Sequence, residues 1–160
     1  MKTIAFLESL VELVRQQLPP QLQGFSVVGP TRSLVKIHYG TPAVHYEVWV
    51  QRRRCEMEIG LHFESDHMTN IRYMELLKAR VDEIKSSLGP RFSVENWDRG
   101  WTRAHETVVL EALTDDFVVE SSFKLSTMMR TLEPILTQEV KSFVGYIRFA
   151  VCTSVPKSIL

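Results

Sequence analysis

The sequence of 160 residues is poor in several features by which protein classes are recognised. It has only two cysteines, Cys55 and Cys152, too few for a disulfide framework and not paired at metal-ligand spacing. We expect both to be small buried residues in a reducing compartment. Lysine plus arginine and aspartate plus glutamate each number 19, so no net charge attracts the chain to nucleic acid or to an anionic membrane.

Long apolar runs and catalytic sequence motifs are also missing. No apolar run reaches the roughly 20 residues that span a bilayer, and Glu8 and Glu12 interrupt the apolar N-terminal stretch that a signal peptide would need. The chain has no Gly-x-Ser-x-Gly nucleophile motif and no glycine-rich phosphate loop. We therefore expect a cytoplasmic protein without a membrane partner, and no motif identifies it as an enzyme.

The periodicity of the apolar residues predicts a single α+β domain over residues 1–160. Apolar residues recur every three or four positions in three helical segments, 3–18, 69–88 and 114–140. Alternation of apolar and polar residues predicts strands over 34–39, 43–51, 55–64, 92–95 and 101–110. The expected order is α-β-β-β-α-β-β-α, with a mostly antiparallel sheet of about five strands and helices packed on one face.

Local signals at the ends of the helices give further expectations. Thr3 is a candidate N-cap of the first helix, and Thr69 or Asn70 is a candidate N-cap of the second. Pro134 lies inside the apolar pattern of the last helix, so we expect a kink or break near Glu133.

The most informative segment is the hairpin formed by the strands 43–51 and 55–64. Its polar residues fall on one side of the two strands: His45, Glu47, Trp49, Glu58, His62 and Glu64. A turn centred on Arg53 and Arg54 places His45 opposite His62, whereas a turn centred one residue earlier places Glu47 opposite Glu58. Both registers leave the apolar side of the hairpin intact, so the pattern does not choose between them.

This polar side has two interpretations. Antiparallel sheets often expose one polar face, which favours an ordinary solvated surface and a protein without a cofactor. Alternatively, two facing histidines and a carboxylate can hold Zn²⁺ or another transition metal. In that case the cofactor is a divalent metal, and the candidate ligands are His45, His62, Glu47 and Glu58.

The order helix-strand-strand-strand-helix-strand resembles the core of the restriction-endonuclease-like nucleases over roughly residues 3–98. That family carries an acidic residue on its second strand and Glu-x-Lys on its third. Here the second strand offers Glu47, and the third offers Glu56 and Glu58, with glutamate in the lysine position. The resemblance implies that these three carboxylates bind Mg²⁺ and catalyse phosphodiester hydrolysis.

Two further groups of residues are candidate binding surfaces. Arg52, Arg53 and Arg54 form the only cationic run, which can contact phosphates or an acidic partner or remain a solvated turn. Trp97 and Trp101 flank a tight turn, where they can anchor a partner or close one end of the core.

The C-terminal segment 143–160 begins with residues that are apolar except for Gly145 and Arg148 as far as Val151. We expect this stretch to form a final strand, a helical extension or a homodimer contact, because exposed apolar surface requires a cover.

Taken together, these patterns favour a non-catalytic binding or assembly module. Its expected partner is another protein or a second copy of the chain. Nucleic acid is an alternative partner that the net charge does not favour. The alternative is the metal-dependent nuclease-like phosphodiesterase that uses Glu47, Glu56 and Glu58.

Overall fold

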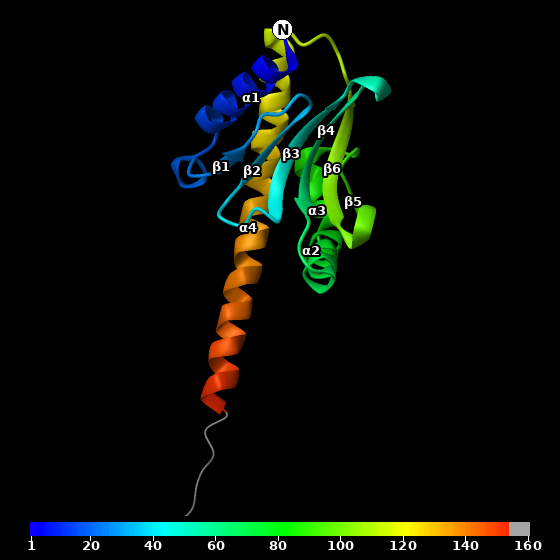
Figure 1. Ribbon diagram of the computed structural model, residues 1–160. Helices are drawn as coiled ribbons and strands as arrows, with labels where there is room; N and C mark the ends of the chain where they lie inside the picture. The colour runs from blue at the N-terminus through cyan, green and yellow to red at the C-terminus, as the bar shows by residue number, and fades with distance from the viewer. Residues whose placement is uncertain (154–160) are drawn as a thin grey trace, which may run out of the picture.

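The structure, a computed structural model, describes the backbone of residues 1–153 and the side chains of residues 1–138. The described residues contain one antiparallel sheet with the strand order β1-β2-β3-β4-β6-β5 (Figure 1). The strands are β1 (Ser26–Val28), β2 (Leu34–His38), β3 (Val44–Gln51), β4 (Glu56–Phe63), β5 (Ser93–Asn96) and β6 (Thr102–Val109). The helices are α1 (Thr3–Gln17), α2 (His67–Ala79), α3 (Val81–Leu88) and α4 (Asp115–Thr153).

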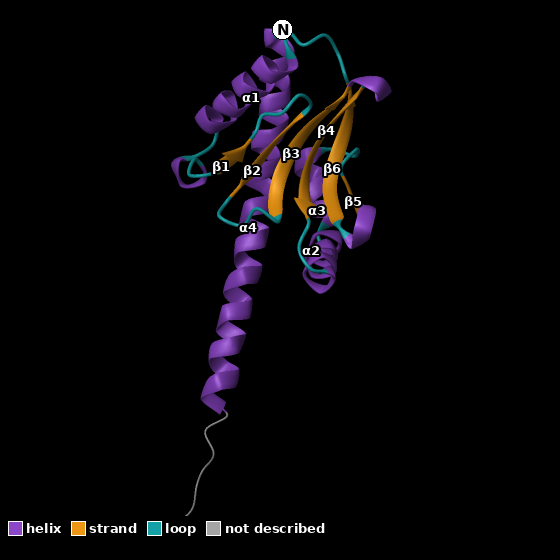
Figure 2. Cartoon of the chain, viewed as in Figure 1, coloured by secondary structure: helices purple, strands orange, loops and turns teal. Residues whose placement is uncertain are grey.

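This architecture confirms the predicted α+β class with an antiparallel sheet and packed helices (Figure 2). The described sheet has six strands because the short segment β1 pairs with β2, joining Ser26 to His38. Only three residues pair, too few for alternation to be visible in the sequence, and the turn at Gly29 and Pro30 directly follows them.

The central hairpin adopts the first of the two expected registers. His45 lies opposite His62, and Trp49 lies opposite Glu58. The connection is longer than a two-residue turn, because Arg52–Arg54 form a short 3-10 helix and Cys55 takes a left-handed conformation with φ of 53°. Strand β6 then pairs with the other edge of β4 and places Arg103 opposite His62.

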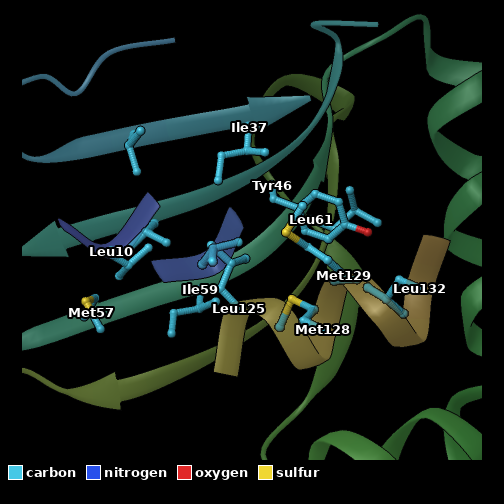
Figure 3. Close-up of a cluster of buried hydrophobic side chains, with 14 of the residues drawn as sticks. Leu10, Ile37, Tyr46, Met57, Ile59, Leu61, Leu125, Met128, Met129 and Leu132 are labelled. Carbon is cyan, nitrogen blue, oxygen red and sulfur yellow. The ribbon is translucent and has the colours of Figure 1, made fainter. Parts of the chain in front are cut away.

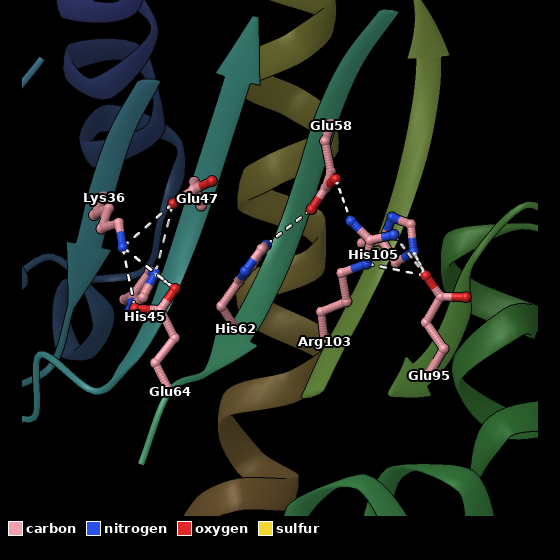
Figure 4. A network of polar contacts seen from close by, with 9 residues as sticks. All are labelled: Lys36, His45, Glu47, Glu58, His62, Glu64, Glu95, Arg103 and His105. Carbon is pink, nitrogen blue, oxygen red and sulfur yellow. Dashed lines mark hydrogen bonds and ion pairs between the residues drawn. The ribbon is translucent and has the colours of Figure 1, made fainter. Parts of the chain in front are cut away.

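The hydrophobic core lies between the sheet and the helices (Figure 3). Alternation along β3 and β4 sends Tyr46, Ile59 and Leu61 to this side, where they are at most 1% exposed. Helices α1 and α4 pack against each other and contribute residues such as Leu10 and Leu125. The opposite side of the sheet carries the polar residues of β3, β4 and β6, with the helices behind the strands (Figure 4).

Two expectations about the helix ends are wrong. Thr3 is the first residue of α1, whose N-cap Lys2 makes no side-chain capping bond. Asp66 caps α2 because its carboxylate accepts a hydrogen bond from the backbone N–H of Thr69. The predicted helix 69–88 is also divided into α2 and α3 at Arg80, which has a non-helical ψ of 15°.

The last helix continues through Pro134 without the expected break. Pro134 is exposed, so water can reach the backbone carbonyl that loses its intrahelical partner. Thr114 caps this helix, accepting a hydrogen bond from the N–H of Phe117. The tail was expected to form a final strand, a helical extension or a homodimer contact, and its backbone is helical as far as Thr153. The predicted assembly contact 143–160 lies outside the residues with described side chains.

Within the part of the chain that the structure describes, no helix has the length and apolar character needed to cross a membrane.

Candidate functional site

A buried polar network occupies the side of the sheet that faces away from the helices (Figure 4). The expectation of a solvated face is wrong here. His45 is 1% exposed, Glu47 4%, Glu58 2% and His62 0%. The network is completed by residues of the neighbouring strands and loops, namely Lys36, Glu64, Glu95, Arg103 and His105.

Charged hydrogen bonds hold the half of the network on β4, β5 and β6. The guanidinium of Arg103 donates to Glu58 at 2.7 Å and to Glu95 at 2.7 Å. Nε2 of His62 lies 2.8 Å from Oε1 of Glu58, and Nε2 of His105 lies 3.0 Å from Oε1 of Glu95. Glu58 therefore accepts from a guanidinium and an imidazole, which compensates its burial.

The other half of the network gathers around the side chain of Lys36 on β2. Its ammonium lies 3.5 Å from Glu47 and 3.3 Å from Glu64. Nε2 of His45 lies 3.7 Å from an oxygen of each of these two carboxylates. Lys36 and Glu64 are the partly exposed members, so this half opens to solvent on their side.

The surroundings shift the pKa values of three groups in this network. Burial alone would raise the pKa of Glu47, but the imidazole of His45, 3.7 Å away, and the nearby positive charges, including Lys36, hold it below its usual value. The hydrogen bonds from Arg103 lower the pKa of Glu95. Burial lowers the pKa of His105, because its charged form loses hydration.

The two central histidines stack and each keeps one unused nitrogen. Their ring centroids are 5.6 Å apart and the ring planes differ by 16°. Nδ1 of His45 lies 2.8 Å from the carbonyl of Pro42, and Nε2 of His62 is engaged by Glu58. The remaining nitrogens, Nε2 of His45 and Nδ1 of His62, are buried without a hydrogen-bond partner.

The structure brings together part of the predicted metal-ligand set. His45 and His62 meet as the first register required, but Glu58 lies behind His62 as its hydrogen-bond partner and Glu47 is engaged by Lys36. The carboxylate that joins the two histidines is Glu64, with one ligand atom of each residue within 4.8 Å of the others. The alternation had placed Glu64 on this side, and it lies diagonal to His45 because the strand pairing continues past β4, where the N–H of Glu64 donates to the carbonyl of Ala43.

The three carboxylates of the nuclease resemblance share the polar side but do not form one cluster of free acids. Glu47 lies opposite Gly60, so it is diagonal to Glu58, and each carboxylate has its own cation, Lys36 or Arg103. Glu56 lies at the hairpin end opposite Gln51 and is partly exposed.

The two tryptophans of the predicted binding turn lie at the edge of the polar network. Trp97 packs edge-on against His62 with centroids 4.9 Å apart, and Trp101 lies 6.0 Å from Trp97. The guanidinium of Arg103 lies 5.3 Å from the Trp97 centroid. Trp97 therefore covers part of the network, while both rings keep partly exposed surface.

The predicted arginine turn forms one wall of a surface hollow. Arg52, Arg53 and Arg54 line it together with Arg32 from the β1–β2 loop and with Trp49 from β3. Its volume is about 440 Å³. All four arginines are exposed, and within the described residues none of them forms an ion pair, although Arg52 donates a hydrogen bond to Thr3. We call this surface the arginine hollow.

A second cavity, of about 260 Å³, lies between the core side of the sheet and α4. The sequence patterns did not predict it. Tyr46 of β3 and Glu133 of α4 line it, and the Tyr46 hydroxyl donates to Glu133 at 2.9 Å. Burial raises the pKa of both groups. Tyr46 had been placed on the apolar side, but no signal in the sequence linked it to a residue 87 positions away.

The expectation that both cysteines are buried is wrong for Cys55, which is exposed in the hairpin connection. Cys152 lies outside the residues with described side chains.

Comparisons with protein-family models, curated proteins and solved structures give no significant match to this chain.

Proposed function

We propose that this protein is a non-catalytic binding module whose recognition surface is the arginine hollow, and that its ligand is an acidic segment of a protein partner. The observation that carries the proposal is the gathering around Trp49 of four exposed arginines, which form no ion pair within the described residues, in a chain of zero net charge. Arginine side chains bind carboxylates through two parallel hydrogen bonds, which gives both attraction and orientation.

Two properties of the hollow favour an acidic peptide over nucleic acid. The four arginines of the hollow gather at the end of the central hairpin where β3 and β4 are joined. Nineteen acidic residues balance the basic ones over the whole chain, so a long polyanion gains little from the remaining surface. A short acidic peptide can contact the four arginines without lying against the acidic residues of the remaining surface.

A direct test measures the fluorescence anisotropy of a labelled eight-residue oligoglutamate peptide as the full-length protein is added. Exposed charge pairs contribute about 0.2–1 kcal/mol each, so we expect weak binding that declines as salt increases. Replacing Arg53→Ala and Arg54→Ala together should weaken binding about fivefold. Lys78→Ala with Arg130→Ala removes the same charge from exposed helix positions and should have much less effect.

Two outcomes would overturn this assignment. Equal losses in the two double variants would show that net charge, and not the hollow, controls binding. Tighter binding of an eight-nucleotide oligothymidylate than of the peptide, with the same dependence on Arg53 and Arg54, would make nucleic acid the ligand.

The nuclease-type alternative is supported by the position of Glu47 and Glu58, two buried carboxylates that share the polar side of β3 and β4. Incubation of supercoiled plasmid with Mg²⁺ or Mn²⁺ tests it. Cleavage by the wild type that Glu58→Gln abolishes would replace the binding module with the phosphodiesterase. No cleavage under either metal would leave the binding proposal as the only candidate.

A further inference from the structure

We infer that His45, His62 and Glu64 form a binding site for a divalent transition metal of the Zn²⁺, Co²⁺ and Ni²⁺ class. This site is separate from the arginine hollow at the end of the same hairpin, and it does not depend on the proposed binding function. The three residues each place one ligand atom within 4.8 Å of the other two, and side chains from the surrounding strands enclose them (Figure 4).

The hydrogen bonds of the two imidazoles point to metal ligation. The carbonyl of Pro42 can only accept, so a neutral His45 carries its proton on Nδ1 and its lone pair on Nε2. The carboxylate of Glu58 likewise fixes the proton of a neutral His62 on Nε2 and leaves the lone pair on Nδ1. Histidines that bind metals usually donate their other nitrogen to a carbonyl or carboxylate in this way.

The burial of the two free nitrogens supplies an independent observation. Nε2 of His45 and Nδ1 of His62 have no hydrogen-bond partner, and their residues are 1% and 0% exposed. Unsatisfied buried acceptors of this kind are unfavourable, and coordination to a metal ion would satisfy them. Glu64 keeps 19% of its side chain exposed and therefore provides a route from solvent.

The charge of the network also matches a divalent cation. Its four carboxylates face two permanent cations, Lys36 and Arg103, which leaves two negative charges when the three imidazoles are neutral. Two imidazole nitrogens and one carboxylate oxygen suit Zn²⁺, Co²⁺ and Ni²⁺, whereas Mg²⁺ and Ca²⁺ prefer sites made only of oxygen.

The residues around the ligands take defined supporting roles. Glu58 is a positioning residue, since it orients His62 and is itself held by Arg103. The ammonium of Lys36 lies 3.3 Å from Glu64 and competes with a metal for that carboxylate. Trp97 packs 4.9 Å from the His62 ring, where a paramagnetic ion bound to His62 would quench its fluorescence.

The experiment uses tag-free, full-length protein stripped with EDTA and titrated with Zn²⁺ in a calorimeter and with Co²⁺ in visible absorption. We expect one ion per chain, a Co²⁺ spectrum of nitrogen and oxygen ligation, and partial quenching of tryptophan fluorescence by Co²⁺. Glu64→Gln, at a partly exposed position, should weaken binding at least tenfold while the metal-free protein keeps its circular dichroism spectrum. Glu58→Gln should weaken binding 10- to 100-fold through the orientation of His62.

Two further variants separate this site from adventitious binding. His67→Gln removes an exposed histidine on α2 and should leave the titration unchanged. Lys36→Met removes the competing ammonium and should leave metal affinity equal or higher. The inference is overturned if the protein takes up no stoichiometric Zn²⁺ or Co²⁺, if Glu64→Gln binds as the wild type does, or if His67→Gln abolishes binding.

Discussion

Gly60 shows how one small residue permits the buried polar network to form. It lies on the polar side of β4, opposite Glu47 on β3 and His105 on β6. A Cβ atom at this position would come 2.6 Å from the Cβ of His105, a distance that real Cβ atoms essentially never show. The missing side chain also leaves room for Glu58 and His62, two residues before and after it, to meet by hydrogen bonding.

Gly60→Ala should therefore destabilise the protein by about 1–3 kcal/mol, because a methyl group is forced into a packed region next to backbone atoms. Urea unfolding followed by circular dichroism measures the change. Gly24→Ala is the matched control, since its Cβ would meet nothing within 4 Å and its φ is not positive. Equal stabilities of the two variants would contradict the close packing of β4 and β6.

Glu133 is a second residue whose surroundings give a measurable consequence. Burial raises its pKa, so folding becomes less favourable as the pH rises through that raised value. Relative to Glu133→Gln, the wild type should lose stability between about pH 4, near the unfolded pKa, and pH 7. The glutamine carbonyl still accepts the hydroxyl of Tyr46.

Thermal unfolding midpoints at pH 4 and pH 7 test this expectation. Glu133→Gln should melt at a higher temperature than the wild type at pH 7, with a smaller difference at pH 4. Glu120→Gln, at an exposed position of α4, should show no such dependence. A constant difference between Glu133→Gln and the wild type at both pH values would be inconsistent with a raised pKa.

At the scale of the elements, helix α4 differs most from its prediction. Its periodicity predicted a helix, and Pro134 predicted a kink or break; the backbone has no break there. Local propensity is weaker than packing here, because Leu132, Ile135 and Leu136 are buried on both sides of the proline. The exposed position of Pro134 limits the penalty to the lost hydrogen bond and the crowding of its ring.

Pro134→Ala should accordingly stabilise the protein, by up to about 3 kcal/mol, because alanine restores the backbone donor and removes the ring clash. Chemical unfolding of the full-length protein provides the measurement, with Glu120→Ala as an exposed helical substitution of small effect. A loss of stability in Pro134→Ala would mean that the proline itself shapes the packing of α4.

At the scale of the whole molecule, α4 extends beyond the sheet it covers. Its 39 residues correspond to about 58 Å of helix, whereas the eight-residue strands span about 26 Å. Figure 1 shows the C-terminal half of this helix projecting past the end of the sheet. The sequence of this projection includes the apolar stretch from Phe143 to Val151.

We expect this projection to mediate self-association, since an apolar stretch of sequence requires a cover from water. Light scattering coupled to size exclusion should give a mass that rises with protein concentration toward twice 18.5 kDa. Phe143→Asp combined with Ile147→Asp should return the mass to that of one chain, whereas Ser142→Asp should change it little. A single-chain mass at all concentrations of the wild type would contradict this expectation.

The sequence predicted the helices and strands more reliably than it predicted the candidate metal site. Alternation along 44–50 and 56–63 is a local property, and it correctly assigned which residues share the polar side of the hairpin. The register depended on the loop from Arg52 to Cys55. No local sequence pattern predicted the left-handed conformation of Cys55 in this loop. The burial of the network came from Arg103 and Trp97, which follow β4 by more than 30 positions.

By itself, the sequence determined the α+β class, the antiparallel hairpins and the separation of apolar from polar sides, because these follow from hydrophobic periods of two and about 3.6. Only the tertiary structure decided that the polar side is buried, that Glu64 joins His45 and His62, and that Arg32 joins the arginine turn. The physical reason is that pairing and bending of the chain set the distances between residues on different elements, and those distances control both desolvation and ligand geometry.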